Sequence, residues 1–305
     1  MGSKGFTDAD VPDQTGKTFF VTGANSGLGF EASKVLARQG ARVLLGCRNP
    51  AKAEDALARI KADHPDADVV FVPLDLQDLA SVKAAADIVL AEPRLDGLIN
   101  NAGIMITPYA LTKDGFESQF GVNHLGHFAL TGHLLALLDS TEGARIVNTS
   151  SNGHKMGDID FDDLKAEKKY NSTIRYGMTK LANLLFSLEL NKRLTAAGSG
   201  TIAVTVHPGG AETDLARHLG WAKAMIPLMR PFLNTAAQGA WPTLMGATWP
   251  DAERDHYYGP RGLGEIKGPA KRVRGNAKSQ DPERARRLWE VSEELTGVRY
   301  LSADA

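Results

Sequence analysis

From Lys17 onward, short runs of β-branched or apolar residues alternate with longer stretches in which apolar residues recur at helical spacing. This alternation is typical of strand–helix–strand units built on a parallel sheet. Six runs are predicted to be strands: Thr18 to Thr22, Arg42 to Gly46, Val69 to Leu74, Gly97 to Asn100, Arg145 to Asn148 and Ile202 to His207. Six strands suit one sheet, so we expect a single α/β domain.

The intervening stretches carry helix start and stop signals. A helix over Gly29 to Arg38 is closed by Gly40, and one over Ala51 to Lys61 is opened by Pro50. A final amphipathic helix is predicted over Asp281 to Leu295. Because strand–helix–strand crossovers are right-handed, helices should cover both faces of a Rossmann-type, doubly wound, mostly parallel sheet. Ligands of such sheets bind at the carboxyl ends of the strands.

The first sixteen residues contain Asp8, Asp10 and Asp13 and no apolar stretch, so they do not resemble a secretory signal. We expect residues 1–16 to form a flexible tail and residues 17–305 to form the domain. No apolar run approaches the roughly 18 residues that a membrane span requires. The sequence therefore predicts a cytoplasmic protein without a membrane span.

Composition narrows the range of ligands. With 35 basic and 36 acidic residues, the net charge of −1 provides no overall field that would attract nucleic acid. The single cysteine, Cys47, excludes intramolecular disulfides and a cysteine-rich zinc cluster. His124, His127 and His133 lack further ligands at familiar spacing, so no metal site is expected. We expect a small-molecule substrate, with any redox chemistry supplied by a cofactor.

A glycine-rich segment lies between the first predicted strand and the first predicted helix. It reads Thr22-Gly23-Ala24-Asn25-Ser26-Gly27-Leu28-Gly29. Glycines allow a tight turn and a close approach to pyrophosphate, and the helix start offers free N–H groups and a positive dipole. An ordinary glycine-rich turn is the alternative, but the position between strand and helix favours phosphate binding.

Tyr176 and Lys180 are four residues apart, which places both side chains on one face of a helix. The free phenol of tyrosine has a pKa of about 10, too high for efficient proton exchange near neutrality. An adjacent ammonium group is expected to lower this pKa by favouring the phenolate. A packed tyrosine beside a solvated lysine is the more common fate of an isolated Y-x-x-x-K, so the pair needs support from other motifs.

That support comes from further motifs placed after successive strands. Asn100-Asn101-Ala102-Gly103 follows the fourth strand, Ser151 the fifth, and Pro208-Gly209 the sixth, with Thr213 beyond. Together with the T-G-x-x-x-G-x-G spacing of the glycine segment, Asn123 and Y-x-x-x-K, these motifs span residues 18 to 213. In this order and position they resemble the short-chain dehydrogenase/reductase family.

The resemblance implies a role for each of four polar residues. Tyr176 would be the general acid or base, and Lys180 would lower its pKa and bind the nicotinamide ribose. Ser151 would hold the substrate oxygen, and Asn123 would anchor a water that joins Lys180 to solvent. Ser150 competes with Ser151, which we prefer because the family usually uses the second serine of such a pair.

The family's cofactor is a nicotinamide dinucleotide, and the end of the second strand bears on which one. An NAD enzyme would place a carboxylate there, whereas this strand ends in Cys47-Arg48-Asn49 and no acid occurs before Glu54. Because Arg48 suits a 2′-phosphate, NADP(H) is expected over NAD(H), although Arg48 could be an ordinary surface residue.

The resemblance also assigns contacts along the rest of the cofactor. Asp75 would bind the adenine, with Leu76 beside it, and Asp78 is the better helix cap. The residues expected to contact the cofactor are Gly23, Asn25, Ser26, Gly27, Leu28, Gly29, Arg48, Asp75, Leu76, Asn101, Ala102, Gly103, Tyr176, Lys180, Pro208, Gly209 and Thr213.

Two segments depart from the general family pattern. The long interval between Ser151 and Tyr176 implies an insertion, Asn152 to Arg175, whose charge run predicts a solvated loop. This interval resembles the branch that contains retinol dehydrogenases, WW-domain oxidoreductases and protochlorophyllide reductases, which suggests bulky lipophilic substrates. Residues 214–269 are expected to cover the substrate, because they follow the Pro208-Gly209 loop, although plain core packing is the more common role of such an apolar stretch.

The function predicted from these observations is NADPH-dependent reduction of a carbonyl, or oxidation of the corresponding alcohol, with Tyr176 exchanging the proton. Reduction of an activated C=C bond could use the same tyrosine. A non-catalytic NADPH-binding sensor or interaction module is the alternative from a different class, and the complete set of four polar residues argues against it. Family members are often dimers or tetramers, so a homo-oligomer is expected.

Overall fold

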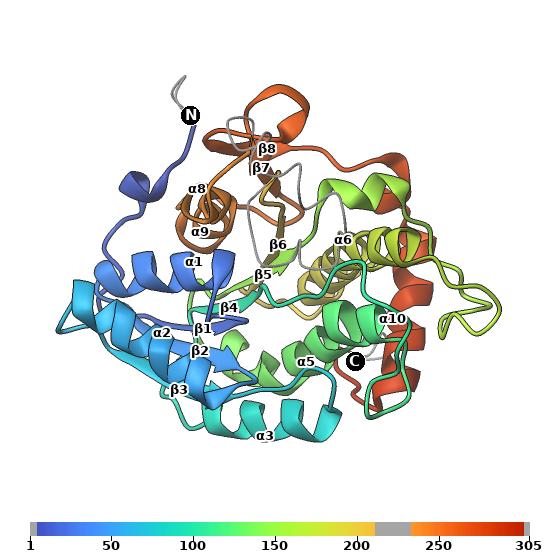
Figure 1. The fold of residues 1–305 in the computed structure, drawn as a ribbon, viewed down its shortest axis with the longest axis horizontal. Helices are drawn as coiled ribbons and strands as arrows, with labels where there is room; N and C mark the ends of the chain where they lie inside the picture. The colour runs from blue at the N-terminus through green and yellow to red at the C-terminus, as the bar shows by residue number, and fades with distance from the viewer. Residues whose placement is uncertain (1–4, 211–232, 302–305) are drawn as a thin grey trace.

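The computed structural model describes residues 5–210 and 233–301. At its centre lies an eight-stranded sheet with the strand order β3-β2-β1-β4-β5-β6-β7-β8 (Figure 1). Neighbouring strands are parallel as far as β7, and β8 pairs antiparallel with β7. The strands are β1 Thr18–Thr22, β2 Arg42–Cys47, β3 Val69–Pro73, β4 Gly97–Asn100, β5 Arg145–Thr149, β6 Ile202–Val206, β7 Tyr257–Pro260 and β8 Ala270–Val273.

The six predicted strands are confirmed to within a residue at each end, and so is the doubly wound sheet. Neither β7 nor β8 was predicted from the sequence. Each has four residues, and β7 ends in Gly259 and Pro260, which usually interrupt strands. These two strands extend the sheet beyond β6 and continue the edge along which the candidate site lies.

Helices cover both faces of the sheet, as Figure 1 shows. The side of α1 also carries α2, α8 and α9, whereas α3, α5 and α6 cover the opposite side, with α10 packed outside α6. The α-helices are α1 Gly27–Arg38, α2 Pro50–Asp63, α3 Leu79–Val89, α4 Ser118–Phe120, α5 Gly126–Asp139, α6 Ser172–Ala196, α8 Ala236–Gly239, α9 Trp241–Thr248 and α10 Pro282–Thr296. Shorter turns are η1 Asp8–Asp10, η2 Gly121–Leu125, η3 Asn152–Met156, η7 Leu263–Glu265 and η8 Ala277–Gln280, of which η2 is a π-helix and the others are 3₁₀-helices.

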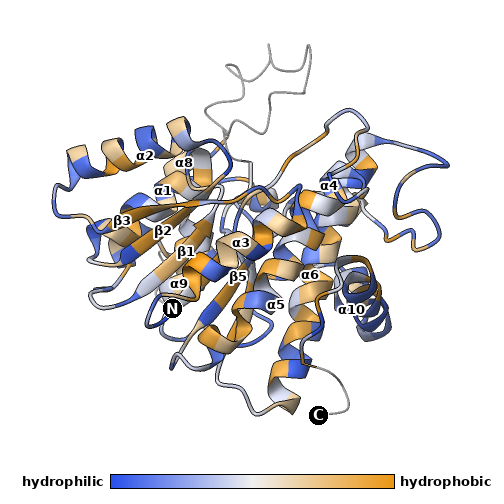
Figure 2. Ribbon diagram, turned by 90° about the horizontal axis from the view of Figure 1, so that it is seen from below, coloured by the Kyte–Doolittle hydropathy of each residue, from blue (hydrophilic) through white to orange (hydrophobic). Residues whose placement is uncertain are grey.

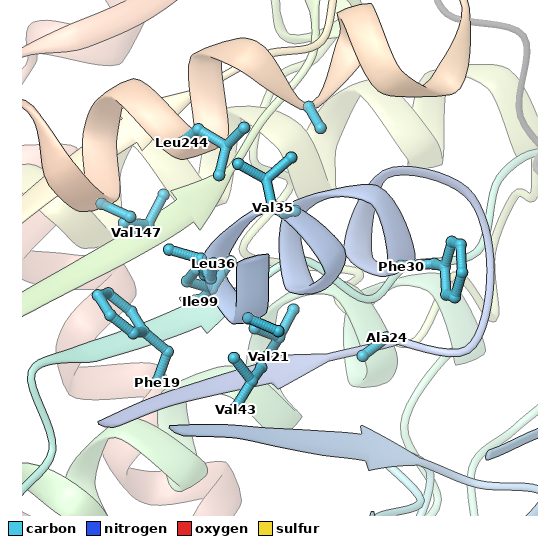
Figure 3. Packing of buried hydrophobic residues seen from close by; sticks show 14 of the residues in the cluster. Phe19, Val21, Ala24, Phe30, Val35, Leu36, Val43, Ile99, Val147 and Leu244 are labelled. Carbon is cyan, nitrogen blue, oxygen red and sulfur yellow. The ribbon is translucent and has the colours of Figure 1, made fainter. Parts of the chain in front are cut away.

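Successive strand residues enter two different cores because side chains of a strand alternate between faces. Phe19 and Val21 of β1 pack with Val35 and Leu36 of α1 (Figure 3). Phe20, between them, belongs to the core on the opposite face. Strands buried on both faces appear in the sequence as continuous apolar runs. Figure 2 shows this pattern, with the hydrophobic colour concentrated on the central strands and a largely hydrophilic α10.

The N-terminal segment differs from the expectation. Within residues 5–16, Phe6 and Val11 are buried, and Phe6 forms an antiparallel bridge with Ala270 at the edge of β8. The Phe6 ring also meets Trp249 edge-on, at 5.7 Å between centroids. The prediction of a flexible tail is therefore wrong for residues 5–16, because their apolar side chains are covered by the sheet edge. Residues 1–4 lie outside the described part.

The expectation that residues 214–269 cover the substrate needs a similar correction. Residues 214–232 lie outside the described part of the chain. Leu244 and Met245 of α9 are fully buried in the core beside α1, and Tyr257 and Tyr258 belong to the sheet. The part from α8 to β7 is therefore framework and not a cover, because its apolar residues pack against the sheet.

Candidate active site

The glycine-rich segment turns sharply between β1 and α1. Gly23 and Gly27 have φ angles of +67° and +57°, in the left-handed region that favours glycine. A Cβ on Gly29 would lie 2.5 Å from both the Gly23 oxygen and the Asn101 side-chain nitrogen. Ser26 caps α1 without a side-chain hydrogen bond to the helix. The turn therefore presents backbone at close range beside a helix start, which fits a pyrophosphate group.

The end of β1 is tied to the loop after β4 through Thr22, a residue to which the sequence analysis assigned no role. The Thr22 hydroxyl accepts the N–H groups of Asn101 and Ala102 at 3.0 and 2.9 Å. It also lies 2.9 Å from Nε2 of His127. Burial lowers the pKa of His127 to about 4, so the ring is neutral at pH 7. Thr22 is the first residue of the glycine-rich motif, and this position in the sequence could have indicated its role.

One cavity of about 460 Å³ joins these elements to the carboxyl end of β5. Of the residues expected at the cofactor, Leu28, Arg48, Gly103, Tyr176 and Lys180 are among those that line it. Its lining comprises Gly23, Asn25, Ser26, Gly27, Leu28, Arg48, Asn49, Lys52, Asn101, Ala102, Gly103, Ile104, Met105, Thr149, Ser150, Tyr176, Lys180 and Pro208.

Several expected contacts are not part of that lining. Gly29, Asp75 and Leu76 lie outside it, and Asp75 accepts the N–H of Gln77 at 3.0 Å. Asp78 caps α3 as predicted by accepting the N–H of Ala80. Gly209, with φ +73°, follows Pro208 but is not in the lining. Thr213 lies outside the described residues.

Two cations line the cavity near the end of β2. Arg48 lies directly after this strand, and Lys52 lies in the first turn of α2. The Asn49 side chain caps α2 by accepting the N–H of Lys52 at 3.1 Å. Lys52 was missed by the sequence analysis, although its spacing of four residues from Arg48 was visible. The pair can hold a doubly charged anion such as a ribose phosphate.

Tyr176 and Lys180 lie on one face of α6, as their spacing predicted. Lys180 is buried and donates a hydrogen bond from Nζ to the Thr149 carbonyl at 3.1 Å. The same Nζ lies 5.6 Å from the centroid of the Tyr176 ring. Met178, Leu181 and Leu185 pack into a core on another face of the helix. The helix thus buries its apolar residues and turns Tyr176 and Lys180 toward the cavity.

The two serines after β5 have different surroundings. The Ser150 hydroxyl is buried and donates to the Lys180 carbonyl at 2.7 Å. The Ser151 hydroxyl begins η3 by accepting the N–H of Gly153 at 3.1 Å, and it also contacts the Tyr176 phenol. The cavity lining includes Ser150 and not Ser151, but the contact with the phenol favours Ser151 as the partner of Tyr176.

The pKa of Tyr176 does not follow the expectation. Burial of the phenol raises its pKa above the usual 10, and the contact with Ser151 opposes only part of the rise. Burial also lowers the pKa of Lys180 to about 8. The net shift of the Tyr176 pKa is therefore upward and not downward as expected, because loss of hydration is the largest influence on the pKa of both groups. At neutral pH the phenol is protonated and Lys180 is mainly an ammonium.

Asn123 lies in the π-helical turn η2, fully buried. Its side-chain nitrogen donates to the Ile104 carbonyl and to the Thr179 hydroxyl, and its oxygen accepts the Ile104 N–H at 2.8 Å. The side chain therefore holds the loop after β4 against α6. Both side-chain N–H groups are used, so a water near Lys180 could be bound only by an oxygen of Asn123.

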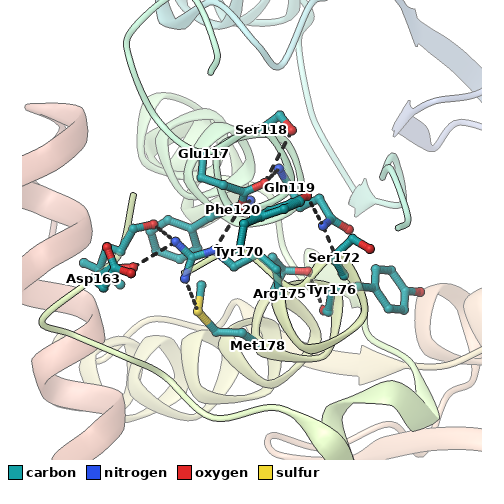
Figure 4. A network of polar contacts seen from close by, with 12 residues as sticks. Glu117, Ser118, Gln119, Phe120, Asp163, Tyr170, Ser172, Arg175, Tyr176 and Met178 are labelled. Carbon is teal, nitrogen blue, oxygen red and sulfur yellow. Dashed lines mark hydrogen bonds and ion pairs between the residues drawn. The ribbon is translucent and has the colours of Figure 1, made fainter. Parts of the chain in front are cut away.

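The inserted segment Asn152 to Arg175 is only partly the solvated loop that its charges suggested. Its first part forms η3, and a Cβ on Gly157 would lie 2.3 Å from the backbone of Gly177, so the segment crosses α6 directly beside Tyr176. Its last residue, Arg175, is buried and pairs with Glu117 at 3.2 Å (Figure 4). The prediction of a solvated loop is therefore wrong at both ends, which pack around the first turn of α6.

The histidines have structural contacts. His124 bonds to Ser292 at 2.9 Å and stacks on Phe120, and His207 lies 3.1 Å from a Glu265 carboxylate oxygen. Within residues 5–210 and 233–301, the His, Cys, Asp and Glu side chains form no cluster of three or more that could hold a metal ion. Over the same residues, no helix is long and apolar enough to cross a membrane.

A glycine turn at a helix start, a tyrosine with a buried lysine one helical turn away and a serine beside the phenol define the class of a nicotinamide-dependent oxidoreductase. The family model described as short chain dehydrogenase matches residues 17–223. The chain belongs to the short-chain dehydrogenase/reductase family and is an oxidoreductase.

Individual relatives cover nearly the whole chain. Retinol dehydrogenase 12 of Mus musculus is 43% identical over 295 residues, covering 96% of this chain and 90% of its own length. A crystal structure of an uncharacterized protein from Mycobacterium paratuberculosis is 41% identical, with a TM-score of 0.82 over 97% of this chain and 99% of that one. A short chain dehydrogenase from Burkholderia cenocepacia in complex with NADP is 25% identical, with a TM-score of 0.61 over 77% and 92% of the chains.

Proposed function

We propose that the protein interconverts a lipophilic carbonyl compound and the corresponding alcohol with NADP(H). The observation that carries this proposal is the position of Tyr176 and Lys180 in the same cavity as the glycine turn. A proton donor and a dinucleotide cradle thus share one space, with Ser151 in contact with the phenol. A module that only binds a dinucleotide would not need this proton donor.

Tyr176, Ser151 and Lys180 have different roles in the proton transfer. The nicotinamide supplies or accepts the hydride when it is bound. The Tyr176 phenol, kept protonated by its raised pKa, gives its proton to the substrate oxygen during reduction and recovers it in the reverse direction. Ser151 holds that oxygen by a hydrogen bond. The Lys180 ammonium stabilises the phenolate that remains, because it is buried at short range and carries its charge at neutral pH.

The preference for NADP(H) rests on the end of β2. Arg48 and Lys52 line the cavity there, and within the described residues neither forms a salt bridge. The strand end carries no carboxylate that would accept hydrogen bonds from ribose hydroxyls. A 2′-phosphate would supply the negative charge that these cations lack.

A lipophilic substrate is supported by the surface near Tyr176. Ile104 and Met105 line the cavity, and two exposed apolar side chains, Met156 and Ile174, lie on the segments that flank the tyrosine. Relatives at 42–43% identity are named retinol dehydrogenases. Both observations favour a substrate that buries hydrocarbon beside its reacting oxygen.

The proposal is tested by NADPH consumption against a panel of aldehydes, ketones and enones, from small aromatic compounds to long isoprenoids. Wild type and Tyr176→Phe are compared at equal concentrations of NADPH-binding sites. Turnover of lipophilic carbonyls that falls at least ~10²-fold in the variant supports the proposal. Turnover of enones alone would replace it with C=C reduction. Tight NADPH binding without turnover of any compound would leave a binding module.

A further inference from the structure

A buried ion pair lies one residue from Tyr176, joining Arg175 at the start of α6 to Glu117 at the start of α4. The Arg175 Nε and a Glu117 carboxylate oxygen are 3.2 Å apart, and the two side chains are 7% and 0% exposed. Burying two charges is costly and is offset only when further hydrogen bonds satisfy them. The other contacts of this pair therefore indicate what it holds together.

The guanidinium group of Arg175 forms hydrogen bonds with the backbone of the inserted segment. One terminal nitrogen donates to the carbonyls of Asp163, at 3.0 Å, and Leu164, and the other lies 3.1 Å from the Met178 sulfur. Figure 4 shows the Arg175 side chain pointing toward Glu117 and Asp163, away from the Tyr176 phenol. Arg175 thus reaches the middle of the insertion from the turn that carries Tyr176, without touching the phenol.

Glu117 connects this turn to the segment that carries Asn123. Its carboxylate accepts the N–H groups of Gln119 and Phe120 at 2.8 and 3.0 Å, which caps α4. The π-helical turn η2, with Asn123, follows directly. A single carboxylate therefore fixes the start of the Asn123 segment and the start of α6 to each other.

Gln119 makes a second link between the same segments. Its side-chain oxygen accepts the Ile106 N–H at 2.9 Å, and its nitrogen donates to the Ser172 carbonyl at 3.0 Å. Ile106 lies in the loop after β4, two residues beyond Ile104, whose backbone is hydrogen-bonded to Asn123. Three segments thus meet at the first turn of α6: the loop after β4, the turn with Asn123 and the insertion.

We propose that Arg175 is a positioning residue for Tyr176, fixing the first turn of α6 through Glu117 so that the phenol faces Ser151 and the substrate oxygen. This proposal rests on the function proposed above for Tyr176. The other contacts of this first turn are the Asn171 cap, the hydrogen bond from Gln119 to the Ser172 carbonyl and the crossing at Gly177. A displacement of about 1 Å at a reacting group can reduce the rate ~10²-fold, so loss of the pair should affect catalysis.

The test compares Arg175→Met, Arg175→Lys, Glu117→Gln and the double variant Arg175→Met/Glu117→Gln with wild type. Asp158→Asn is the matched control, because Asp158 ties the same insertion to Lys278, at 2.7 Å, and to Arg284, away from Tyr176. For each protein we would measure kcat, KM, the NADPH Kd by fluorescence, the pH profile of kcat and Tm. Rates are referred to the concentration of NADPH-binding sites, so unfolded protein does not count.

The proposal predicts a separation between stability and catalysis. Arg175→Met and Glu117→Gln each leave one buried charge unpaired and lower Tm, whereas the double variant removes both charges and recovers part of the loss in Tm. In Arg175→Met and in the double variant, kcat falls ~10- to 100-fold, NADPH Kd stays within about threefold and the alkaline limb of the pH profile of reduction moves. Arg175→Lys keeps the positive charge but lacks the planar guanidinium group, so its kcat should lie between those of wild type and Arg175→Met. Asp158→Asn keeps kcat within about twofold.

Two results would overturn the proposal. If kcat recovers together with Tm in the double variant, the pair only stabilises the fold. If Arg175→Met fails to fold, an unchanged kcat and pH profile in Arg175→Lys would lead to the same conclusion. Tyr176→Phe, measured in parallel, separates the two claims. Full activity of Tyr176→Phe would reject both the proposed function and the positioning role of Arg175. Loss of activity in Tyr176→Phe, together with unchanged kcat in the Arg175 variants, would reject only the positioning role.

Discussion

The Nζ of Lys180 lies 5.6 Å from the centroid of the Tyr176 ring, one helical turn away on the same face of α6. Both groups are deprived of water, and their pKa values move in opposite directions: that of Tyr176 rises and that of Lys180 falls to about 8. The neutral phenol and the ammonium can therefore coexist at neutral pH. This relationship makes the protonation of Lys180 the property most open to measurement.

The first prediction concerns the pH dependence of stability. The Lys180 pKa is about 8 in the folded protein and near its usual 10.5 in the unfolded chain. Between these values the unfolded chain binds more protons, so the contribution of Lys180 to the free energy of unfolding rises with pH. Wild type should gain up to about 3 kcal/mol relative to Lys180→Met from pH 8 to 10.5. Denaturant unfolding of both proteins measures this difference, and parallel pH curves would contradict it.

The second prediction concerns cofactor choice. Arg48→Ala should weaken NADPH binding ~10- to 100-fold and leave NADH binding almost unchanged, because only NADPH carries the 2′-phosphate. Lys52→Ala should act in the same direction with a smaller effect, since an ammonium cannot bind bidentately. Fluorescence titration with both cofactors measures the two ratios. An equal loss of affinity for NADH and NADPH would contradict a contact between Arg48 and the 2′-phosphate. It would indicate that Arg48 contacts another part of the cofactor or supports the fold.

The third prediction concerns the glycine turn. Gly29→Ala would place a methyl group 2.5 Å from the Gly23 oxygen, and the backbone must shift to accept it. We expect a loss of about 1–3 kcal/mol of stability together with at least ~10-fold weaker NADPH binding. Gly200→Ala is the control, because a Cβ there meets no atom within 4 Å. Similar behaviour of the two variants in unfolding and binding would refute the close-approach argument.

The fourth prediction separates the two serines. Ser151→Ala should lower kcat ~10²- to 10³-fold with little change in Tm, because it removes a hydrogen bond to the substrate oxygen. Ser150→Ala should cost about 1 kcal/mol of stability, since its buried hydroxyl serves the Lys180 carbonyl. Steady-state kinetics and thermal unfolding of both variants provide the comparison. The reverse assignment would appear as a larger kcat loss in Ser150→Ala.

The sequence predicted the features that depend on local pattern. Strand periodicity, the glycine turn and the four-residue spacing of Tyr176 and Lys180 are local, and the structure brings their residues to one cavity. Short strands such as β7 gave no such pattern, because Gly259 and Pro260 follow only two tyrosines. Contacts across long intervals were also out of reach. Glu117 and Arg175 are far apart in the chain, and nothing in either local sequence marks them as a pair.

Burial was the other property that the sequence could not supply. The expected lowering of the Tyr176 pKa was based on the charge of Lys180, whereas burial is the largest influence on the pKa of both groups in the folded protein. Phe6 illustrates the same limit, since its acidic surroundings concealed a side chain that is covered by the edge of β8. Oligomeric state and cellular location remain predictions.

The central claim is that Tyr176 transfers the proton to the substrate oxygen. Single-turnover oxidation of pre-bound NADPH by a lipophilic aldehyde, followed in wild type and Tyr176→Phe, tests it most directly because cofactor binding is removed from the rate. Our account predicts equal NADPH Kd values and a hydride-transfer rate at least ~10²-fold lower in the variant. A rate equal to wild type, with NADPH bound equally well, would contradict it.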